Sequence, residues 1–256
     1  MSSHFYLSDH HELLAEGKAL LSGQEAQHII RVLRKKIGDE VLLFDGSGRE
    51  YRSIIKEIRK NEILFSILEV EEKSNAPDLD LTMAVALPKG DRQKWLIEKL
   101  TELGVRRFIP IRAERSDVKI DDDVLDRLRR QVIEASKQSG SLRLMEIFPE
   151  MSRREIAESF PFDSEGSEEG SLAVFSHPLS DGSFGQISFA NLIENSKTKS
   201  TRLREVLAVV GPAGGWTEQE VQAAAEDHWP ILDLGKQIYR AETAAVVLAA
   251  LFLHLE

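Results

Sequence analysis

The sequence of 256 residues contains no cysteine, which excludes a disulfide framework and a zinc site with thiolate ligands. Long hydrophobic runs are also missing. The longest one, Ala244 to Leu253, is too short to cross a bilayer and is typical of a buried helix. The opening residues MSSHFYLSDHHELL lack the basic start and apolar stretch of a secretory signal. We therefore expect a cytoplasmic protein that does not associate with a membrane.

Patterns for metal binding and for nucleophilic catalysis are scarce as well. The seven histidines form no pair at the spacing of metal ligands, so we expect no metal site. No nucleophile elbow of the Gly-x-Ser-x-Gly kind is present. His177 follows a predicted strand in the stretch FSHP and is the one histidine that we expect to lie near a ligand.

Basic residues are fewer than acidic ones, so the formal net charge is −10. Such a balance argues against a nucleic-acid partner. Two stretches depart from it: residues 28–36 carry four basic residues and no acid, and residues 89–115 carry eight basic residues against four acidic ones. Local fields decide binding, so these stretches are either contacts for a polyanion or solvated helix faces.

The pattern along the chain predicts two domains. Residues 1–72 contain short strands, a hairpin around Asp45-Gly46-Ser47-Gly48 and a helix that starts after Ser22, which together suggest a small β-barrel. Residues 73–80 are polar, contain Pro77 and are interpreted as a linker. In residues 81–256 strands alternate with helices, which predicts an α/β domain with a mainly parallel sheet covered on both faces.

Several helix ends and loops in the second domain can be predicted. A helix over residues 91–104 should end at Gly104, and Thr217 with Glu220 forms a capping box that should start another helix. The polar stretches 163–171 and 195–204 are expected to be surface loops.

The stretch VVGPAGGWTEQE combines a strand, a glycine loop and a helix, as many phosphate sites do. A Walker loop needs a lysine at the helix start, and a dinucleotide fingerprint needs another glycine spacing. Here Glu218 and Glu220 occupy the first helical turn and would repel a phosphate. The loop is therefore either a tight turn or a place where the backbone approaches an uncharged or zwitterionic ligand.

Two more polar groups follow predicted strands, where open α/β sheets bind ligands. In LDLGKQIYRAETAA, Arg240 and Glu242 precede an apolar helix and form either part of a site or a structural ion pair. In LPKGDRQKW, three basic residues would lie at a helix start against the helix dipole, which indicates an anionic partner or a solvated basic face.

Four stretches in this order resemble one family: HIIRVLRKKIGDEVLLFDGSG, LPKGDRQKWLIEKLTELGV, VVGPAGGW and LGKQIYRAETA. They are similar to the RsmE family of 16S rRNA (uracil-N3)-methyltransferases, within the SPOUT superfamily, and the similarity covers nearly the whole chain. The resemblance implies a PUA-like β-barrel for RNA binding in residues 1–72 and a SPOUT domain with a deep trefoil knot in residues 81–256. It also implies S-adenosylmethionine as cofactor, 16S rRNA of the small ribosomal subunit as substrate, and a homodimer.

Carried over residue by residue, the resemblance assigns three kinds of site. The expected cofactor contacts are Ser176, His177, Val210, Gly211, Pro212, Gly214, Gly215, Leu234, Gly235, Ile238, Tyr239, Arg240, Glu242, Thr243 and Ala244. The expected RNA contacts are His28, Arg31, Arg34, Lys35, Lys89, Arg92 and Lys94. Arg115 and Arg240 are the candidates for stabilising the uracil anion from which N3 attacks.

The sequence departs from the family pattern at five positions. Ala213 replaces the usual Glu of the glycine loop, Gln237 and Tyr239 replace Arg and Leu, Ser141 replaces Arg, and His4 stands where an arginine is expected. These changes keep open a non-catalytic or retargeted RNA-binding relative that kept the fold. A nucleotide-metabolising enzyme that uses the glycine loop for phosphate is a third hypothesis, and the acidic helix start argues against it.

Overall fold

The computed structural model describes residues 4–8, 14, 16–73, 77–160, 170–178, 187–198 and 203–254. The chain forms two compact units. The first takes in residues 1–76 and 133–144, and the second takes in residues 77–132 and 145–256. The return of residues 133–144 to the first unit is a feature that the sequence analysis did not foresee. None of the helices in the described ranges has the length and apolar character needed to traverse a bilayer.

The first unit is built on a five-stranded sheet with the order β1-β3-β4-β5-β2. Its strands are β1 (His4–Tyr6), β2 (Lys18–Ser22), β3 (Glu40–Phe44), β4 (Arg49–Ile58) and β5 (Glu62–Glu72). β3 and β4 pair antiparallel across the turn at Asp45–Gly48, so the predicted hairpin is confirmed. The predicted helix after Ser22 is α2 (Gly23–Gln27), which continues into a π-helical turn, η1 (His28–Val32).

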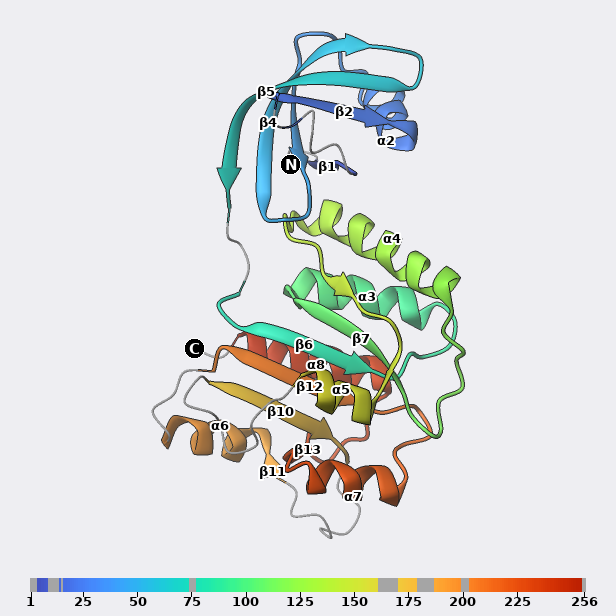
Figure 1. Ribbon diagram of the computed structural model, residues 1–256, viewed down its shortest axis with the longest axis vertical. Coiled ribbons are helices and arrows are strands. Elements are labelled where there is room, and N and C mark those ends of the chain that lie inside the picture. Colours follow the sequence, from blue (N-terminus) through green and yellow to red (C-terminus); the bar gives the residue numbers. More distant parts are fainter. Residues whose placement is uncertain are drawn as a thin grey trace. The chain divides into compact units, whose positions relative to one another are not determined.

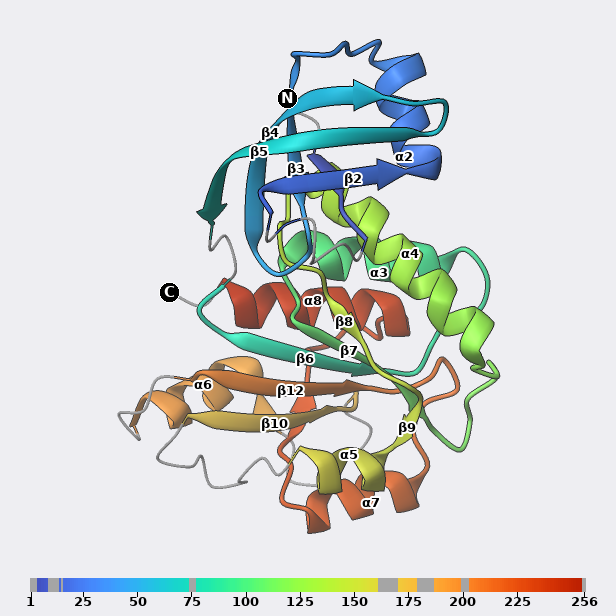
Figure 2. The same ribbon diagram turned by 45° about the horizontal axis from the view of Figure 1, so that its top comes forward.

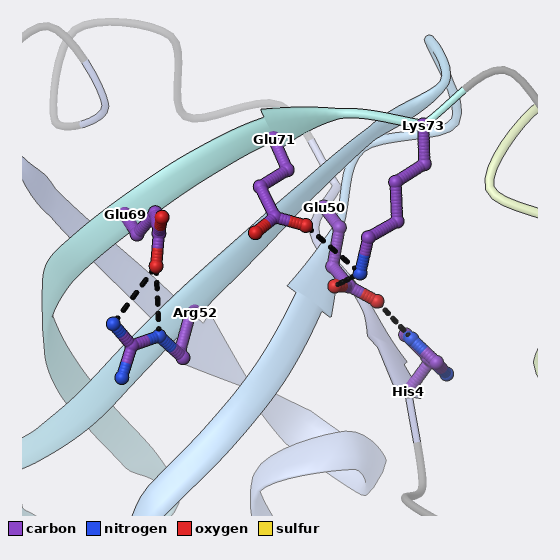
Figure 3. A network of polar contacts seen from close by, with 6 residues as sticks. All are labelled: His4, Glu50, Arg52, Glu69, Glu71 and Lys73. Atoms are coloured by element: carbon purple, nitrogen blue, oxygen red, sulfur yellow. Dashed lines mark hydrogen bonds and ion pairs between the residues drawn. The ribbon is translucent and has the colours of Figure 1, made fainter.

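A polar network ties the ends of three strands of this unit together (Figure 3). The buried carboxylate of Glu50 in β4 contacts the ring of His4 in β1 at 2.5 Å and also pairs with Lys73, just after β5. Burial alone would raise the pKa of Glu50, but the hydrogen bonds from Lys73 and His4 outweigh it and hold the pKa below its usual value. The network therefore links the short strand β1 to the rest of the sheet.

The second unit contains a sheet in which every described strand pair is parallel, with the order β11-β13-β10-β12-β6-β7-β8 and β9 beside β7. Its strands are β6 (Asp80–Val85), β7 (Arg107–Arg112), β8 (Glu146–Ile147), β9 (Met151–Ser152), β10 (Ser171–Ser176), β11 (Ile187–Ser188), β12 (Glu205–Val210) and β13 (Ile231–Asp233). The predicted α/β fold with a parallel sheet is confirmed.

Helices cover both faces of this sheet (Figure 2). They are α3 (Arg92–Leu103), α5 (Arg153–Ser159), α6 (Phe189–Thr198), α7 (Glu218–Glu226) and α8 (Ala241–Leu253), whereas α4 (Asp122–Ser139) is divided between the two units at residue 133. α8 packs on β6 and β12 and against α3, whereas residues of α5 and α7 join the core on the opposite face. The apolar composition of α8 is therefore explained largely by burial inside the unit.

The helix ends agree with the sequence except in one region. α3 ends at Gly104 in the left-handed conformation, and the capping box of Thr217 and Glu220 starts α7, as predicted. The expected loop over residues 195–204 is wrong in its first part, because residues 195–198 are the last turn of α6 (Figure 1). Most of the other expected loop, residues 163–169, lies outside the described residues, and β10 begins at Ser171.

Candidate functional site

The carboxyl ends of four adjacent strands meet at one edge of the second unit's sheet. Ser176 of β10 is the register partner of both Val210 of β12 and Leu232 of β13, and Val210 is the partner of Val85 of β6. The loops after these strands therefore start side by side, although they are far apart in the sequence. These loops, the strand ends before them and the first turn of α8 carry the expected cofactor residues, and the loop after β6 carries Lys89, so the structure brings these predictions together.

Trp216 sets the shape of the glycine loop. Its side chain is only 6% exposed, stacks at 4.5 Å between ring centroids on Phe175, and donates from Nε1 to the carbonyl oxygen of Ser176 at 3.0 Å. A Cβ atom on Gly211 would lie 2.6 Å from Cε2 of Trp216, so only glycine fits there. Trp216 thus holds the loop against the end of β10, and the sequence alone had assigned no role to this residue.

Arg115 holds the other side of the same loop. Its guanidinium donates to the carbonyl oxygens of Gly214 at 3.0 Å and Trp216 at 3.5 Å. A Cβ atom on Gly214 would lie 3.3 Å from Cβ of Arg115, so this approach is also close. Arg115, one of the two candidate catalytic residues, therefore orients the backbone of the glycine loop through these hydrogen bonds.

The loop before α8 is exposed, and the helix that follows it carries a buried acid. Glu242 is 5% exposed, lies 3.5 Å from Arg92 of α3, and its Oε2 atom has no hydrogen-bond partner in the described structure. The alternative of a structural ion pair between Arg240 and Glu242 is therefore wrong, because Glu242 faces a different arginine. Arg240 itself is exposed and is the N-cap of α8.

The start of α3 carries a buried polar side chain with structural hydrogen bonds and exposed basic side chains beside it. Gln93 is buried, donates to the carbonyl oxygen of Pro88 at 2.8 Å and accepts from Arg127 at 2.8 Å. It fixes the loop after β6 and was missed by the sequence analysis, which treated this turn only as a basic face. Lys89 pairs with the exposed Asp117, while Lys94 points to solvent.

The remaining expected RNA contacts lie in the first unit. His28, Arg31 and Arg34 are exposed in and after η1, and Arg34 has a positive φ of 54°. Lys35 is half-buried and donates to the carbonyl oxygen of Glu40 at 3.2 Å. Three of these four side chains are thus open to a partner.

Hydrogen bonds to the carboxylate of Glu220 already occupy the start of α7. Glu220 accepts from the backbone and side chain of Thr217 and from the backbone of Glu114 at 2.9 Å. A carboxylate therefore occupies the place where a phosphate would bind a helix start, which argues against the nucleotide hypothesis. Across the described residues, histidines and acids form no group of three suited to a metal ion.

Comparisons with known proteins identify the class of protein to which this fold and these loops belong. Residues 74–253 match the family model described as an RNA methyltransferase domain, and residues 21–68 match the one described as an RNA methyltransferase PUA domain. The chain is thus built as an RNA methyltransferase with an appended PUA domain.

Curated relatives narrow this class. The chain is 30% identical over 88% of its length to ribosomal RNA small subunit methyltransferase E of Bacillus subtilis, of which 85% is covered. The protein of the same name from Synechocystis is 28% identical over 93% of this chain and 74% of the relative. This chain belongs to the ribosomal RNA small subunit methyltransferase E family.

Solved structures agree with that assignment. A crystal structure of ribosomal RNA small subunit methyltransferase E from Neisseria gonorrhoeae, bound to S-adenosyl methionine, is 27% identical, with a TM-score of 0.80 over 98% of this chain and 96% of that one. A methyltransferase from Legionella pneumophila shares the fold at 23% identity, with a TM-score of 0.78 and the same coverage. The family expected from the four sequence stretches is confirmed.

Proposed function

We propose that this chain transfers a methyl group from S-adenosylmethionine to N3 of one uridine in 16S rRNA of the small ribosomal subunit. The observation that carries the proposal is that the loops after four strands start at one edge of the sheet. Hydrogen bonds from Trp216 and from Arg115 to the backbone fix the glycine loop in place there. The relatives' names indicate the substrate class, and the cofactor named with the Neisseria structure indicates the methyl donor.

The residues at this edge fit such a cofactor. Nothing lies within 4 Å of the place that a Cβ would take on Gly215, so a flat adenine can approach the loop backbone there. The orphaned oxygen of Glu242 is a buried acceptor that a ligand hydroxyl or ammonium would satisfy. The residues proposed to hold the cofactor are those expected from the sequence: Ser176, His177, Val210, Gly211, Pro212, Gly214, Gly215, Leu234, Gly235, Ile238, Tyr239, Arg240, Glu242, Thr243 and Ala244. When bound, S-adenosylmethionine supplies an electrophilic methyl group.

The chain's own part in the chemistry is to favour the uracil anion and to orient it. N3 of uracil carries a proton and pairs in a duplex, so the base must be exposed and deprotonated before it can attack. Arg240 is exposed at the start of α8 and is proposed to stabilise the negative charge on the uracil carbonyls. Arg115 is proposed to act by holding the glycine loop, since its guanidinium already bonds two loop carbonyls.

The finer features of the fold are proposals too. The five-stranded sheet of the first unit and the PUA match support a PUA-like barrel, with exposed His28, Arg31 and Arg34 as RNA contacts beside Lys35. Lys89, Arg92 and Lys94 are proposed as contacts from the second unit. The trefoil knot is proposed for the segment that carries β12, β13 and α8, because these elements line the proposed cofactor site.

A homodimer in the cytoplasm completes the proposal. Large apolar side chains stay exposed on the second unit, among them Trp95 of α3, Ile238 before α8 and Leu251 of α8. Ile238 is 85% exposed, which is unusual for isoleucine and fits a surface that another copy covers. Light scattering on the purified protein should give about twice the mass of one chain.

The substrate is tested by nucleoside mass spectrometry of 16S rRNA from cells that lack the gene. We expect the 3-methyluridine of 16S rRNA to disappear and to return when the gene is restored. A normal level of 3-methyluridine in the deletion strain would contradict the substrate, and calorimetry would then distinguish a retargeted enzyme, which binds S-adenosylmethionine, from a non-catalytic relative, which does not.

A further inference from the structure

One buried carboxylate at the carboxyl edge of the second unit's sheet has no role in the site described so far. Asp233 ends β13 and is 8% exposed, and its Oδ1 atom has no hydrogen-bond partner among the residues that the structure describes. Within the same ranges, no lysine, arginine or histidine forms an ion pair with it. A buried charge without a partner is costly, so this position calls for a positive ligand.

The strand register places Asp233 beside the proposed cofactor loops. Leu232 is the partner of Ser176, and the backbone N–H of His177 donates to the carbonyl oxygen of Leu232 at 3.0 Å. Asp233 is therefore next to His177 where both strands end. Because side chains alternate along a strand, Asp233 shares a face with Ile231, which packs in the core cluster that contains Phe175 and Trp216.

Among the described residues, Asp233 is the buried acid at this edge that has no counter-charge. Glu242 faces Arg92, and Glu220 accepts the hydrogen bonds of the α7 cap. S-adenosylmethionine has a sulfonium, an ammonium and a carboxylate, so its net charge is positive. A sulfonium has no N–H to donate, and a nearby negative charge stabilises it directly. The buried carboxylate of Asp233 at this edge of the sheet offers that negative charge.

We propose that Asp233 is the counter-ion of the cofactor's sulfonium group and makes the site prefer S-adenosylmethionine over S-adenosylhomocysteine. This inference rests on the proposed function. In the transfer, the sulfur–methyl bond breaks, the N3–methyl bond forms, sulfur keeps the electron pair and the N3 proton leaves to solvent. The sulfur of the product, S-adenosylhomocysteine, is an uncharged thioether. Asp233 therefore stabilises bound S-adenosylmethionine and favours release of the product, but it does not lower the barrier to methyl transfer.

Calorimetry with both compounds tests the proposal. We expect Asp233→Asn, which keeps the shape and removes the charge, to weaken binding of S-adenosylmethionine about tenfold or more. Its affinity for S-adenosylhomocysteine should stay within about twofold of the wild type. The matched control is Asp80→Asn, at the opposite end of β6, where the carboxylate is half-exposed and paired with Arg107. This control should bind both compounds like the wild type.

Thermal unfolding of the cofactor-free protein provides a second readout. Asp233→Asn should unfold at the same or a higher temperature than the wild type, because it removes an unpaired buried charge. A lower midpoint would overturn the proposal in favour of a purely structural role. Unchanged affinity for S-adenosylmethionine, or an equal loss for both compounds, would overturn it as well. A wild-type protein that binds neither compound would instead contradict the proposed function, and this inference would fail with it.

Discussion

At the scale of single residues, Trp216 explains the composition of the glycine loop. Thr217 and Glu220 cap the helix after the loop, which argues against a phosphate there. The indole of Trp216 requires glycine at position 211, whereas Gly214 only lies close to Arg115. The tight turn expected from the sequence is therefore present, and the approach of a ligand to its backbone stays a prediction.

Gly211→Ala should therefore destabilise the second unit. The new Cβ would overlap the buried indole ring, which is held by Phe175 and by its hydrogen bond to Ser176, so the ring cannot move away freely. We expect a loss of about 1–3 kcal/mol in the free energy of unfolding, measured by chemical denaturation.

Gly214→Ala is the matched control for that substitution. Its Cβ would lie 3.3 Å from Cβ of Arg115, a contact that a shift of a few tenths of an ångström relieves. We expect a change of less than about 0.5 kcal/mol. Equal effects at the two glycines would contradict the role given to Trp216.

A second residue-scale prediction concerns pH and the network around Glu50 (Figure 3). The pKa of Glu50 is lowered in the folded protein, so its contribution to stability is present above its unfolded pKa of about 4.3. That contribution is lost as the pH falls through the lower folded value. Glu50→Gln should destabilise the first unit by about 1–3 kcal/mol at pH 7, because Lys73 and His4 lose their charged partner.

The difference between wild type and Glu50→Gln should shrink below about pH 4, when the wild-type carboxylate is protonated. Denaturation curves at pH 7 and pH 3 measure it. Glu69→Gln is the control, since Glu69 forms a solvent-exposed pair with Arg52 and should matter little at either pH. A difference between wild type and Glu50→Gln that stays constant with pH would contradict the charged network.

At the scale of secondary-structure elements, the contact between α3 and α8 links two groups that the sequence analysis kept apart. Arg92 was expected to bind RNA and Glu242 to bind the cofactor, and the structure pairs them at 3.5 Å. Arg92 therefore has a structural partner, whereas Lys94 in the same helical turn is exposed to solvent.

Arg92→Met and Lys94→Met should separate these roles. We expect Arg92→Met to lower the free energy of unfolding by about 1–2 kcal/mol, because the buried Glu242 loses its counter-charge. Lys94→Met should leave stability unchanged and should weaken RNA binding mainly at low salt. Equal stability of the two variants would contradict the structural role of Arg92.

Elements with a strong local signal were predictable, and the others were not. Gly104 ended α3 and Thr217 started α7 as expected, because caps depend on the nearest residues alone. α6 was missed where polar residues 195–198 suggested a loop. Local polarity does not distinguish a polar last turn of a helix from a loop.

At the scale of the whole molecule, the alternation of strands and helices predicted the parallel α/β sheet, and the motifs predicted the family. The register that aligns Ser176 with Val210 and Leu232 could not be predicted, because it depends on contacts between distant segments. The same reason explains why Asp233, Gln93 and the return of residues 133–144 to the first unit were missed.

The most direct test of the proposed activity is methyl transfer by the purified protein. Small ribosomal subunits from cells lacking the gene would be incubated with S-adenosylmethionine that carries a deuterated methyl group, and the 16S rRNA nucleosides analysed by mass spectrometry. We predict deuterated 3-methyluridine at one position in each rRNA, and none when Arg240→Ala replaces the wild type. Label in another nucleoside, or no label at all, would contradict the proposed function.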